Sequence, residues 1–311
     1  MSTPSLAVTL AGIAFRNPVL TASGTFGYGK EYLGLVPMER LGGITVKGVS
    51  PFPSNGNATP RTCEVFAGLL NAIGLQNPGI DKFIAHPDYL PFLRTVDTQV
   101  LVNIWGRTID DYVEVARRLE AEREGIAALE INISCPNIKE GGISFGTNLQ
   151  QAGKVVKAVR AVTTLPLTTK LSPNVSHIAD FARCVVDNGS DMLSLINTFP
   201  AMAIDIETRR PKLANITGGL SGPAIKPLAV RMVYECHQAV KVPIIGMGGI
   251  YTAADAIEFM LAGASAIAVG TALFADPMAP MHIIDGIGAY LSRHGYVDVS
   301  EIVGQVELPR K

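Results

Sequence analysis

The amino-acid sequence predicts a single α/β domain, residues 1–311, folded as a (β/α)8 TIM barrel with an N-terminal hairpin and long loops on its carboxyl-end face. Eight short β-rich runs recur along the chain, and a helical pattern follows most of them. The composition, 48% hydrophobic and 17% charged, suits parallel strands that are buried on both faces of the sheet.

The predicted strands are short, and the predicted helices carry apolar residues three and four positions apart. The strands are expected at residues 19–21, 44–47, 100–104, 128–134, 167–171, 192–197, 243–247 and 266–269. The helices are expected at residues 109–122, 149–162, 178–188, 229–240, 253–262 and 281–291. The expected N-caps are Asp110, Ser176 and Thr252. The glycines expected to end helices are Gly189, Gly263 and Gly295.

Three segments do not belong to a bare barrel. Residues 5–15 alternate between apolar and polar and are expected to form a hairpin that closes the barrel bottom. Residues 48–79, rich in Pro, Asn and Gly, follow the second strand, and residues 198–222 follow the sixth. Loops after barrel strands lie on the face where active sites are built, so both segments are expected to form a lid or a pocket wall.

The bulk properties argue against several classes of protein. The net charge is −1 with both signs interspersed, so neither nucleic acid nor an anionic membrane is an expected partner. Residues 1–18 lack a signal-peptide pattern and no apolar run reaches the length of a membrane span, so a cytoplasmic protein is expected. Cys63, Cys135, Cys184 and Cys236 form no C-x-x-C pair, so no zinc, iron–sulfur or other metal site is expected in this chain.

Cys135 ends an alternating strand and is followed by proline. Glu130, Asn132 and Ser134 are expected to share one face of this strand and to point inward just before the thiol. A cysteine at such a strand end is a candidate base or nucleophile. The alternative is a small buried hydrophobic residue, which is the usual role of a free cysteine.

The ends of the predicted strands carry polar groups or glycines, and a barrel brings them to one mouth. The last two strands end in glycine-bearing turns before helices, which is typical of the phosphate site of such barrels. Turns that serve packing alone are the alternative. The strand-end residues are Ser23, Lys47, Asn103, Asn132, Lys170, Asn197, Gly248, Gly249, Gly270 and Thr271.

Two lysines lie among apolar neighbours at strand ends, where a cation is costly unless it meets an anion. Lys47 and Lys170 are therefore expected to face a ligand carboxylate or the electron-rich edge of a reduced flavin, the latter suiting Lys170. The alternatives are that they extend to the solvent rim, or that Lys170 forms a Schiff base in a lyase.

Amide side chains form the third element of the predicted site. Asn71, Asn132 and Asn197, with Thr198, offer paired donors and acceptors around one mouth. Any one of them alone is more commonly structural. Together they favour a flat ligand with an imide edge.

Six segments of the chain share a resemblance to one enzyme family. They are residues 17–24 (NPVLTASG), 46–48 (VKG), 71–79 (NAIGLQNPG), 132–137 (NISCPN), 170–174 (KLSPN) and 214–223 (ANITGGLSGP). Over nearly its whole length the chain resembles the class 1 dihydroorotate dehydrogenases. It is most similar to the catalytic subunit of the class 1B, NAD-linked enzymes.

This resemblance implies FMN at the barrel mouth, dihydroorotate as substrate and Cys135 as the base, where the membrane-linked class 2 enzymes have serine. Cys135 would remove a proton from C5 while C6 passes hydride to the flavin, giving orotate for pyrimidine (UMP) biosynthesis. The residues implied to hold FMN are Ser23, Lys47, Gly48, Asn103, Asn132, Lys170, Ile196, Gly222, Gly248, Gly249, Gly270 and Thr271. Those implied to hold dihydroorotate are Lys47, Asn71, Ala72, Ile73, Gly74, Leu75, Asn132, Asn197 and Thr198.

Similarity to class 1B also implies a partner. Electrons would pass to NAD through a second subunit that carries FAD and a [2Fe-2S] cluster, on a homodimeric core within a heterotetramer. The chain has no dinucleotide fingerprint of its own, which agrees with this division. The alternatives are a fumarate-linked class 1A enzyme, a related flavin-dependent pyrimidine oxidoreductase, the lyase, and a non-catalytic flavin-carrying subunit. Ala203 stands where some members of the family carry arginine.

Overall fold

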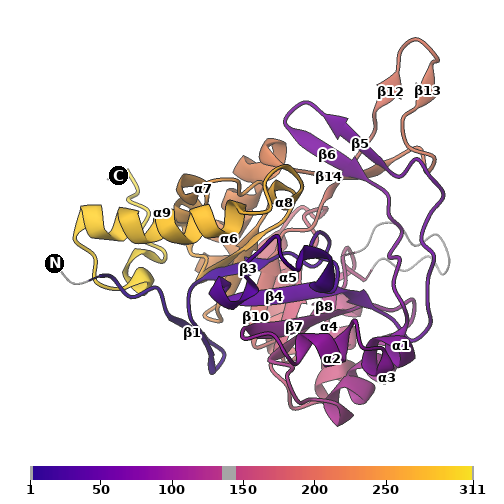
Figure 1. Cartoon of the computed structure of the whole chain (residues 1–311), viewed down its shortest axis with the longest axis horizontal. Coiled ribbons are helices and arrows are strands. Elements are labelled where there is room, and N and C mark those ends of the chain that lie inside the picture. The colour runs from indigo at the N-terminus through magenta and orange to yellow at the C-terminus, as the bar shows by residue number, and fades with distance from the viewer. Residues whose placement is uncertain (1–2, 135–144, 310–311) are drawn as a thin grey trace.

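Eight parallel strands close into a barrel in the computed structural model of this chain, which describes residues 3–134 and 145–309. Each strand pairs with the next along the chain, and the last pairs with the first. The predicted TIM barrel is therefore confirmed (Figure 1). The barrel strands are β3 (Val19–Thr21), β4 (Gly43–Val49), β7 (Gln99–Ile104), β8 (Ala128–Asn132), β9 (Leu167–Lys170), β10 (Met192–Leu195), β15 (Ile244–Met247) and β16 (Ala266–Val269).

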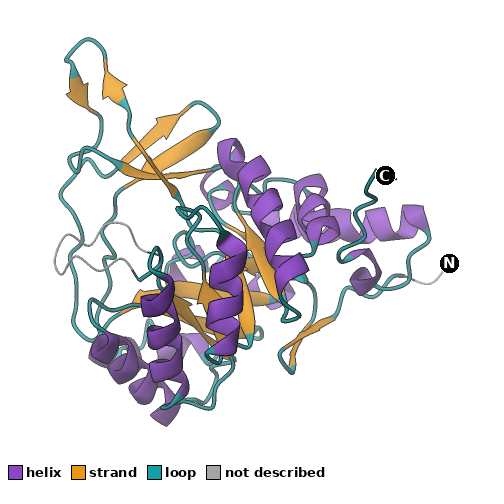
Figure 2. Cartoon of the chain, turned by 180° about the vertical axis from the view of Figure 1, so that it is seen from behind, coloured by secondary structure: helices purple, strands orange, loops and turns teal. Residues whose placement is uncertain are grey.

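Helices surround the strands, as Figure 2 shows in purple and orange. They are α1 (Ile80–Ala85), α2 (Leu90–Leu93), α3 (Ile109–Ala121), α4 (Leu149–Arg160), α5 (Ile178–Asp187), α6 (Lys226–Ala239), α7 (Ala253–Ala262), α8 (Ala272–Ala275) and α9 (Ala279–His294), with 3-10 turns at Lys30–Tyr32, Met38–Arg40, Pro223–Ile225 and Val299–Ile302. All six predicted helices are confirmed, and the periodicity missed α1, α2 and α8 because they are too short to show it. Within the described ranges, no helix is both long enough and apolar enough to traverse a bilayer.

Helix α7 begins and ends as predicted. The Thr252 Oγ1 accepts from the Asp255 N–H at 3.3 Å, and the Asp255 carboxylate accepts in return from the Thr252 N–H at 2.8 Å. Gly263 ends this helix with φ 120°, a conformation that favours glycine. Gly295 ends α9 in the left-handed region, and Gly189 follows the last residue of α5 by two positions.

Two of the expected N-caps are wrong. Thr108 caps α3 in place of Asp110, because its Oγ1 accepts from the Asp111 N–H at 3.2 Å and Asp111 completes a reciprocal capping box. Asp110 lies one residue inside the helix, where its side chain cannot accept from the first turn in this way. Ser176 is not a cap either, since α5 starts after His177 and no side-chain hydrogen bond caps it.

Residues 5–15 contain the predicted hairpin, β1 (Val8–Leu10) antiparallel to β2 (Ile13–Phe15). It lies at the amino ends of the barrel strands, because Gln99, the first residue of β7, donates from Nε2 to the Ala14 carbonyl at 2.9 Å. Phe15 is buried beside Gly43, the first residue of β4. The hairpin therefore closes the barrel at the end opposite the strand-end site residues.

The two long segments expected as loops contain strands of their own, so that expectation is incomplete. They contribute to one antiparallel sheet with strand order β11–β14–β6–β5, in which Gly219 lies opposite Asn71. A second hairpin, β12–β13, projects from the molecule at the upper right of Figure 1. The bounds are β5 (Thr62–Val65), β6 (Gly68–Asn71), β11 (Phe199–Ala201), β12 (Ile204–Asp205), β13 (Arg210–Pro211) and β14 (Gly218–Ser221).

Two barrel strands end two residues earlier than the sequence pattern predicts. Strand β8 ends at Asn132, because the Asn132 Oδ1 accepts from the Ser134 N–H at 3.3 Å and from the Ser134 Oγ at 3.0 Å. Such local hydrogen bonds compete with the strand ladder. Strand β10 ends at Leu195, and shortly beyond it the Asn197 Oδ1 accepts from the Thr198 N–H at 2.8 Å. Both turns place amide side chains at the carboxyl end of the barrel.

Replacing Thr108 with Ala is expected to lower the free energy of unfolding by about 1 kcal/mol, because the Asp111 N–H loses its acceptor. The control is Asp110→Asn, which removes only an exposed charge whose interaction with the helix dipole is screened by salt. Urea unfolding in about 1 M NaCl gives the free energy of unfolding of both variants. At this salt concentration the Debye length is about 3 Å, so the exposed charge of Asp110 is screened. An equal loss of stability in the two would contradict the assignment of Thr108 as the cap.

Candidate active site

A cavity of about 700 Å³ opens at the carboxyl ends of the barrel strands. Ligand pockets commonly measure about 300–1,000 Å³, so this one is large enough for a cofactor or substrate. Of the described residues predicted to form a site, only Ala72 does not line it, and Cys135 lies outside the described residues. The predicted residues that line the cavity are Ser23, Lys47, Gly48, Asn71, Ile73, Gly74, Leu75, Asn103, Asn132, Lys170, Ile196, Asn197, Thr198, Gly222, Gly248, Gly249, Gly270 and Thr271.

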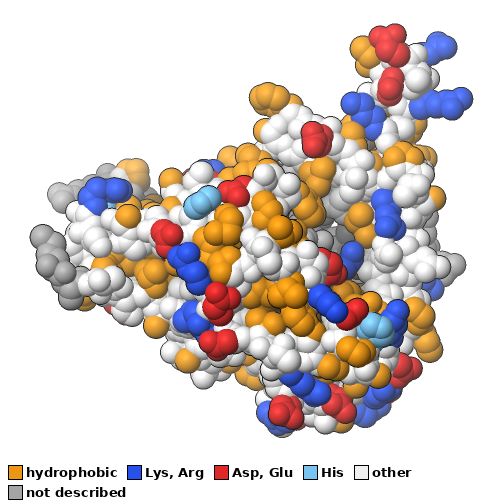
Figure 3. All heavy atoms as spheres, viewed as in Figure 1, with side chains coloured by type: hydrophobic (Ala, Val, Ile, Leu, Met, Phe, Trp, Pro, Cys, Tyr) orange, Lys and Arg blue, Asp and Glu red, His pale blue; other side chains and the backbone are white. Residues whose placement is uncertain are grey.

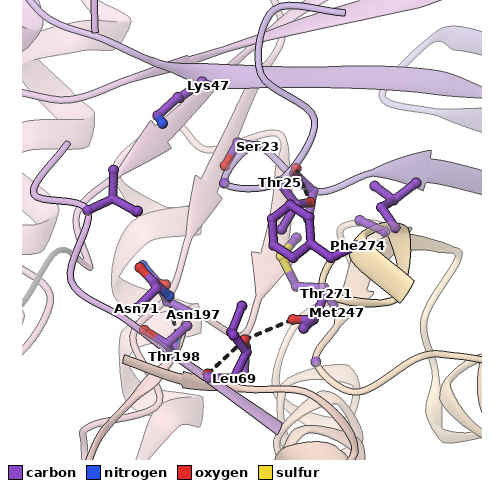
Figure 4. A pocket seen from close by; sticks show the side chains of 18 of the residues that line it. Ser23, Thr25, Lys47, Leu69, Asn71, Asn197, Thr198, Met247, Thr271 and Phe274 are labelled. Atoms are coloured by element: carbon purple, nitrogen blue, oxygen red, sulfur yellow. Dashed lines mark hydrogen bonds between the residues drawn. The ribbon is translucent and has the colours of Figure 1, made fainter. Parts of the chain in front are cut away.

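One side of the cavity, here called the polar side, carries a group of hydrogen-bonding side chains, as Figure 4 shows. Asn71, Asn197 and Thr198 lie together on one side. Phe274 and Met247 lie on the opposite side. Thr25 and Thr271 lie on that side too. A bound molecule would therefore meet the polar side at one end, and apolar contacts together with these two hydroxyl groups at the other.

Ser134 links the amides on the polar side. It is buried, and its Oγ accepts a hydrogen bond from the Asn197 Nδ2 at 2.7 Å while donating to the Asn132 Oδ1 at 3.0 Å. The Thr198 N–H donates to the Asn197 Oδ1 at 2.8 Å. Both asparagine amides are thus fixed in orientation before any ligand binds.

Asn57 positions the loop of residues 71–75, although the sequence pattern did not single it out. Its backbone N–H donates to the Ile73 carbonyl at 3.0 Å, and its Nδ2 donates to the Ala72 carbonyl at 2.9 Å. Gly74 has φ 75°, and a Cβ there would lie 2.6 Å from the Asn57 Cγ. Asn57 stands in a loop rich in Pro, Asn and Gly, where no spacing marks one asparagine among the others.

Lys47 carries a half-buried ammonium group in strand β4. Among the described residues its Nζ makes no hydrogen bond or ion pair. Burial lowers the pKa of Lys47 and the nearby Arg61 lowers it further, whereas Glu31 raises it. An anionic ligand group in the cavity would offset the cost of keeping this cation there.

Lys170 provides a second cation, at the end of strand β9, and it is buried. Its Nζ lies 3.3 Å from the Ser23 Oγ and 3.9 Å from the Glu130 Oε1. Glu130 is fully buried in the barrel and accepts from the Asn103 Nδ2 at 2.6 Å and from the Ser194 Oγ at 2.7 Å. The sequence pattern placed Glu130 on the inward face, as found, but did not indicate its part in this network.

Two buried polar atoms beside the cavity have no hydrogen-bond partner among the described residues: the Asn103 Oδ1 and the Trp105 Nε1. Gly48 lies against both residues, and a Cβ on it would stand 2.7 Å from the Asn103 Oδ1 and 2.8 Å from the Trp105 Cδ1. Buried acceptors are almost always satisfied in folded proteins. Because Asn103 lines the cavity, a ligand N–H is the natural donor to its Oδ1.

The glycine-bearing turns pack backbone against backbone. Gly222, Gly248 and Gly249 have φ of 101°, 124° and 81°, and a Cβ on Gly249 would lie 2.8 Å from the Gly222 carbonyl oxygen. An ion pair joins the segments that follow these turns, since the Lys226 Nζ at the start of α6 lies 2.8 Å from the carboxylate of Asp255 in the first turn of α7. The glycines therefore allow the two turns to pack closely. Gly222, Gly248 and Gly249 also line the cavity, so this part of its wall is backbone without side chains, which suits a phosphate.

The chain is similar to known proteins over nearly its whole length. The family model described as dihydroorotate dehydrogenase matches residues 5–291. The "Dihydroorotate dehydrogenase B (NAD(+)), catalytic subunit" of Geotalea uraniireducens is 57% identical over 304 residues, 98% of this chain and 99% of that protein. The protein of the same name from Geobacter sulfurreducens is 55% identical over 308 residues, 99% and 100% of the two chains. A crystal structure of DHODH in complex with ferulenol from Eimeria tenella shares the fold, with a TM-score of 0.81 at 24% identity over 97% of this chain and 88% of that one.

Gly74→Ala is expected to lower the free energy of unfolding more than Gly12→Ala does. Both glycines have positive φ, 75° and 81°, so both variants carry the strain of a left-handed alanine. Only at position 74 does the new Cβ meet a neighbour, Asn57, whereas nothing lies within 4 Å at position 12. Urea unfolding of the two variants gives the difference, and equal losses would show that Asn57 moves aside freely.

Proposed function

The chain belongs to the dihydroorotate dehydrogenase family, and we propose that it oxidises dihydroorotate to orotate as the catalytic subunit of an NAD-linked enzyme of pyrimidine biosynthesis. The observation that carries this proposal is the cavity, which combines the cations of Lys47 and Lys170 with four asparagine amides. Dihydroorotate has one carboxylate and a ring with amide donors and acceptors. Its charge and its hydrogen-bonding edge match those of the cavity.

The residues of the cavity fit FMN as the resident cofactor. The Asn103 Oδ1 is a buried acceptor without a donor, and the imide N–H of a flavin is such a donor. The Lys170 ammonium suits the edge of the flavin that gains negative charge on reduction. The turns at Gly248 and Gly249 and at Gly270 and Thr271, which line the cavity, suit the phosphate. FMN, when bound, supplies the acceptor for the hydride that the substrate loses.

The polar side of the cavity is the proposed substrate site. Lys47 would bind the carboxylate of dihydroorotate. Both Lys47 and Lys170 line the cavity, but only the Lys47 ammonium has no partner among the described residues. Asn71, Asn132 and Asn197 would hydrogen-bond the ring, with Thr198 beside them. Since Ser134 and the backbone already hold these amides, little side-chain freedom is lost when the substrate binds.

Cys135 is the proposed base, which would remove the proton from C5 of the substrate. The support is its neighbour in the chain, Ser134, which is buried and bonded to Asn197 on the substrate side of the cavity. A free thiol has a pKa of about 8.5, so the reaction should be faster in mild alkali, where more thiolate is present.

Cys135→Ala is expected to leave FMN bound and to slow flavin reduction by dihydroorotate at least about 100-fold, the scale of losing a positioned base. Cys135→Ser should keep a little activity that increases at high pH. Stopped-flow absorbance at the flavin band measures the rate, with Cys184→Ala, a thiol on α5 away from the cavity, as the control. A near-normal rate in Cys135→Ala would show that another group takes the proton.

An apolar surface beside the cavity is the proposed docking site for an electron-transfer subunit with FAD and a [2Fe-2S] cluster. This docking patch consists of Leu33, Leu35, Phe66 and Phe274, all of them exposed, with Phe66 at 100% in the turn between β5 and β6. Figure 3 shows hydrophobic side chains gathered on this face, around α8 and at the tip of the β5–β6 hairpin. Leu35 and Phe274 also line the cavity, so a subunit seated here would be close to the flavin.

The proposed assembly is a cytoplasmic heterotetramer built on a homodimer of this chain. The isolated chain is expected to reduce artificial dyes with dihydroorotate but to reduce NAD only with its partner subunit. Phe66→Asp should lower NADH formation at limiting partner concentration at least about 10-fold while dye reduction persists, because a charge replaces an apolar contact. The control is Val297→Asp, an equally apolar exposed position beside Ser5.

Spectrophotometric assays of NADH and of the dye follow both reactions. Vigorous NADH formation by the isolated chain would contradict the division of labour between two subunits. Oxidation of dihydroorotate with fumarate as acceptor would instead assign the chain to the class 1A type. An unchanged rate in Phe66→Asp would exclude the docking patch.

A further inference from the structure

Glu130 is a buried carboxylate that the proposed reaction does not use. It is 1% exposed in the barrel interior, and its register partner on β7 is Asn103, which lines the cavity. Its two oxygens accept from the Asn103 Nδ2 at 2.6 Å and the Ser194 Oγ at 2.7 Å. A buried carboxylate is costly to desolvate even when it is well bonded. A role for its charge is therefore worth seeking.

The hydrogen bonds of Glu130 do not require a negative charge. Both donors, Asn103 and Ser194, are neutral, and a glutamine side chain could accept from the first and donate to the second. What the carboxylate adds is a charge 3.9 Å from the Lys170 Nζ. The hydrogen-bond partner of that ammonium among the described residues is the neutral Ser23 hydroxyl, at 3.3 Å.

We propose that Glu130 lowers the reduction potential of the bound flavin by partly neutralising the charge that Lys170 presents to it. A cation beside the pyrimidine edge of a flavin stabilises its reduced form. With Lys170 uncompensated, the reduced flavin would hold its electrons more tightly and pass them less readily towards NAD. This inference rests on the proposed function, which makes FMN the resident of the cavity and NAD the final acceptor.

Glu130 is a positioning residue in this account, because it acts through Lys170 rather than on the substrate. Two variants separate its charge from its hydrogen bonds. Glu130→Gln removes the charge and keeps the shape and the bonds to Asn103 and Ser194. Ser194→Ala removes one hydrogen bond and keeps the charge 3.9 Å from Lys170.

The experiment is a redox titration of the FMN-loaded full chain against a reference dye, read from the flavin absorbance. Glu130→Gln is expected to increase the ratio of reduced to oxidised flavin at a fixed potential about 10-fold, an upward shift of about 30 mV for a two-electron couple. Ser194→Ala should leave that ratio near the wild-type value while lowering the melting temperature. An unchanged or smaller ratio in Glu130→Gln, or an equal rise in Ser194→Ala, would overturn the proposal.

Glu130→Asp provides a second test if the glutamine variant does not fold. Its shorter side chain draws the charge away from Lys170, so the ratio should rise by a smaller factor, and a folded Asp variant with an unchanged ratio counts against the proposal. Failure of the proposed function has a different signature. If the wild-type chain binds no FMN, or if dihydroorotate does not bleach its FMN, the proposed function is refuted. If the wild-type chain behaves as expected but Glu130→Gln leaves the flavin potential unchanged, only the role of Glu130 is refuted.

Discussion

Closure of the parallel barrel is the constraint on which the cavity depends. Because all eight strands run in one direction, their carboxyl ends meet at one mouth, and residues far apart in the sequence become neighbours. Ser23 and Lys170 are 147 positions apart, yet their side chains are 3.3 Å from each other. The pairing of β16 with β3 keeps them there, since it completes the ring that includes both strand ends.

The same closure encloses an unusually polar layer. TIM-barrel interiors are filled mainly by branched aliphatic side chains, but here Asn103, Glu130, Ser194 and Lys170 occupy the layer nearest the mouth. Most of their groups are hydrogen-bonded to one another, so the cost of burial is largely offset. The Asn103 Oδ1 is left without a partner among the described residues, and Asn103, like Lys170, lines the cavity. Burying this unpaired acceptor lowers the stability of the fold, but it leaves a hydrogen-bonding group in place for a ligand.

The sequence predicted the barrel and its six longer helices, and all but one of the described residues predicted for the site do line the cavity, because strand ends are a local property that a barrel brings together. About half of the residues that line the cavity were not predicted, among them Tyr32, Met247 and Phe274. The sequence could not predict contacts made by tertiary approach. Asn57 supports the loop of residues 71–75 from a separate loop, and Glu130 acquires its role only once Lys170 lies beside it. The observed cap of α3, Thr108, lies two positions before the expected one, Asp110, and the periodicity of apolar residues does not locate a helix end that closely. The role of Cys135 stays a prediction.

The four-stranded sheet imposes an order on how the protein is made. Strand β6 pairs with β14, and Asn71 donates to the Gly219 carbonyl across 148 positions of sequence. At roughly 5–20 residues per second, the ribosome delivers the second partner about 7–30 s after the first. During that interval β6 has β5 on one side and an unpaired edge on the other, the kind of edge on which foreign strands assemble. Prompt arrival of β14 therefore protects the nascent enzyme from aggregation as well as completing its wall.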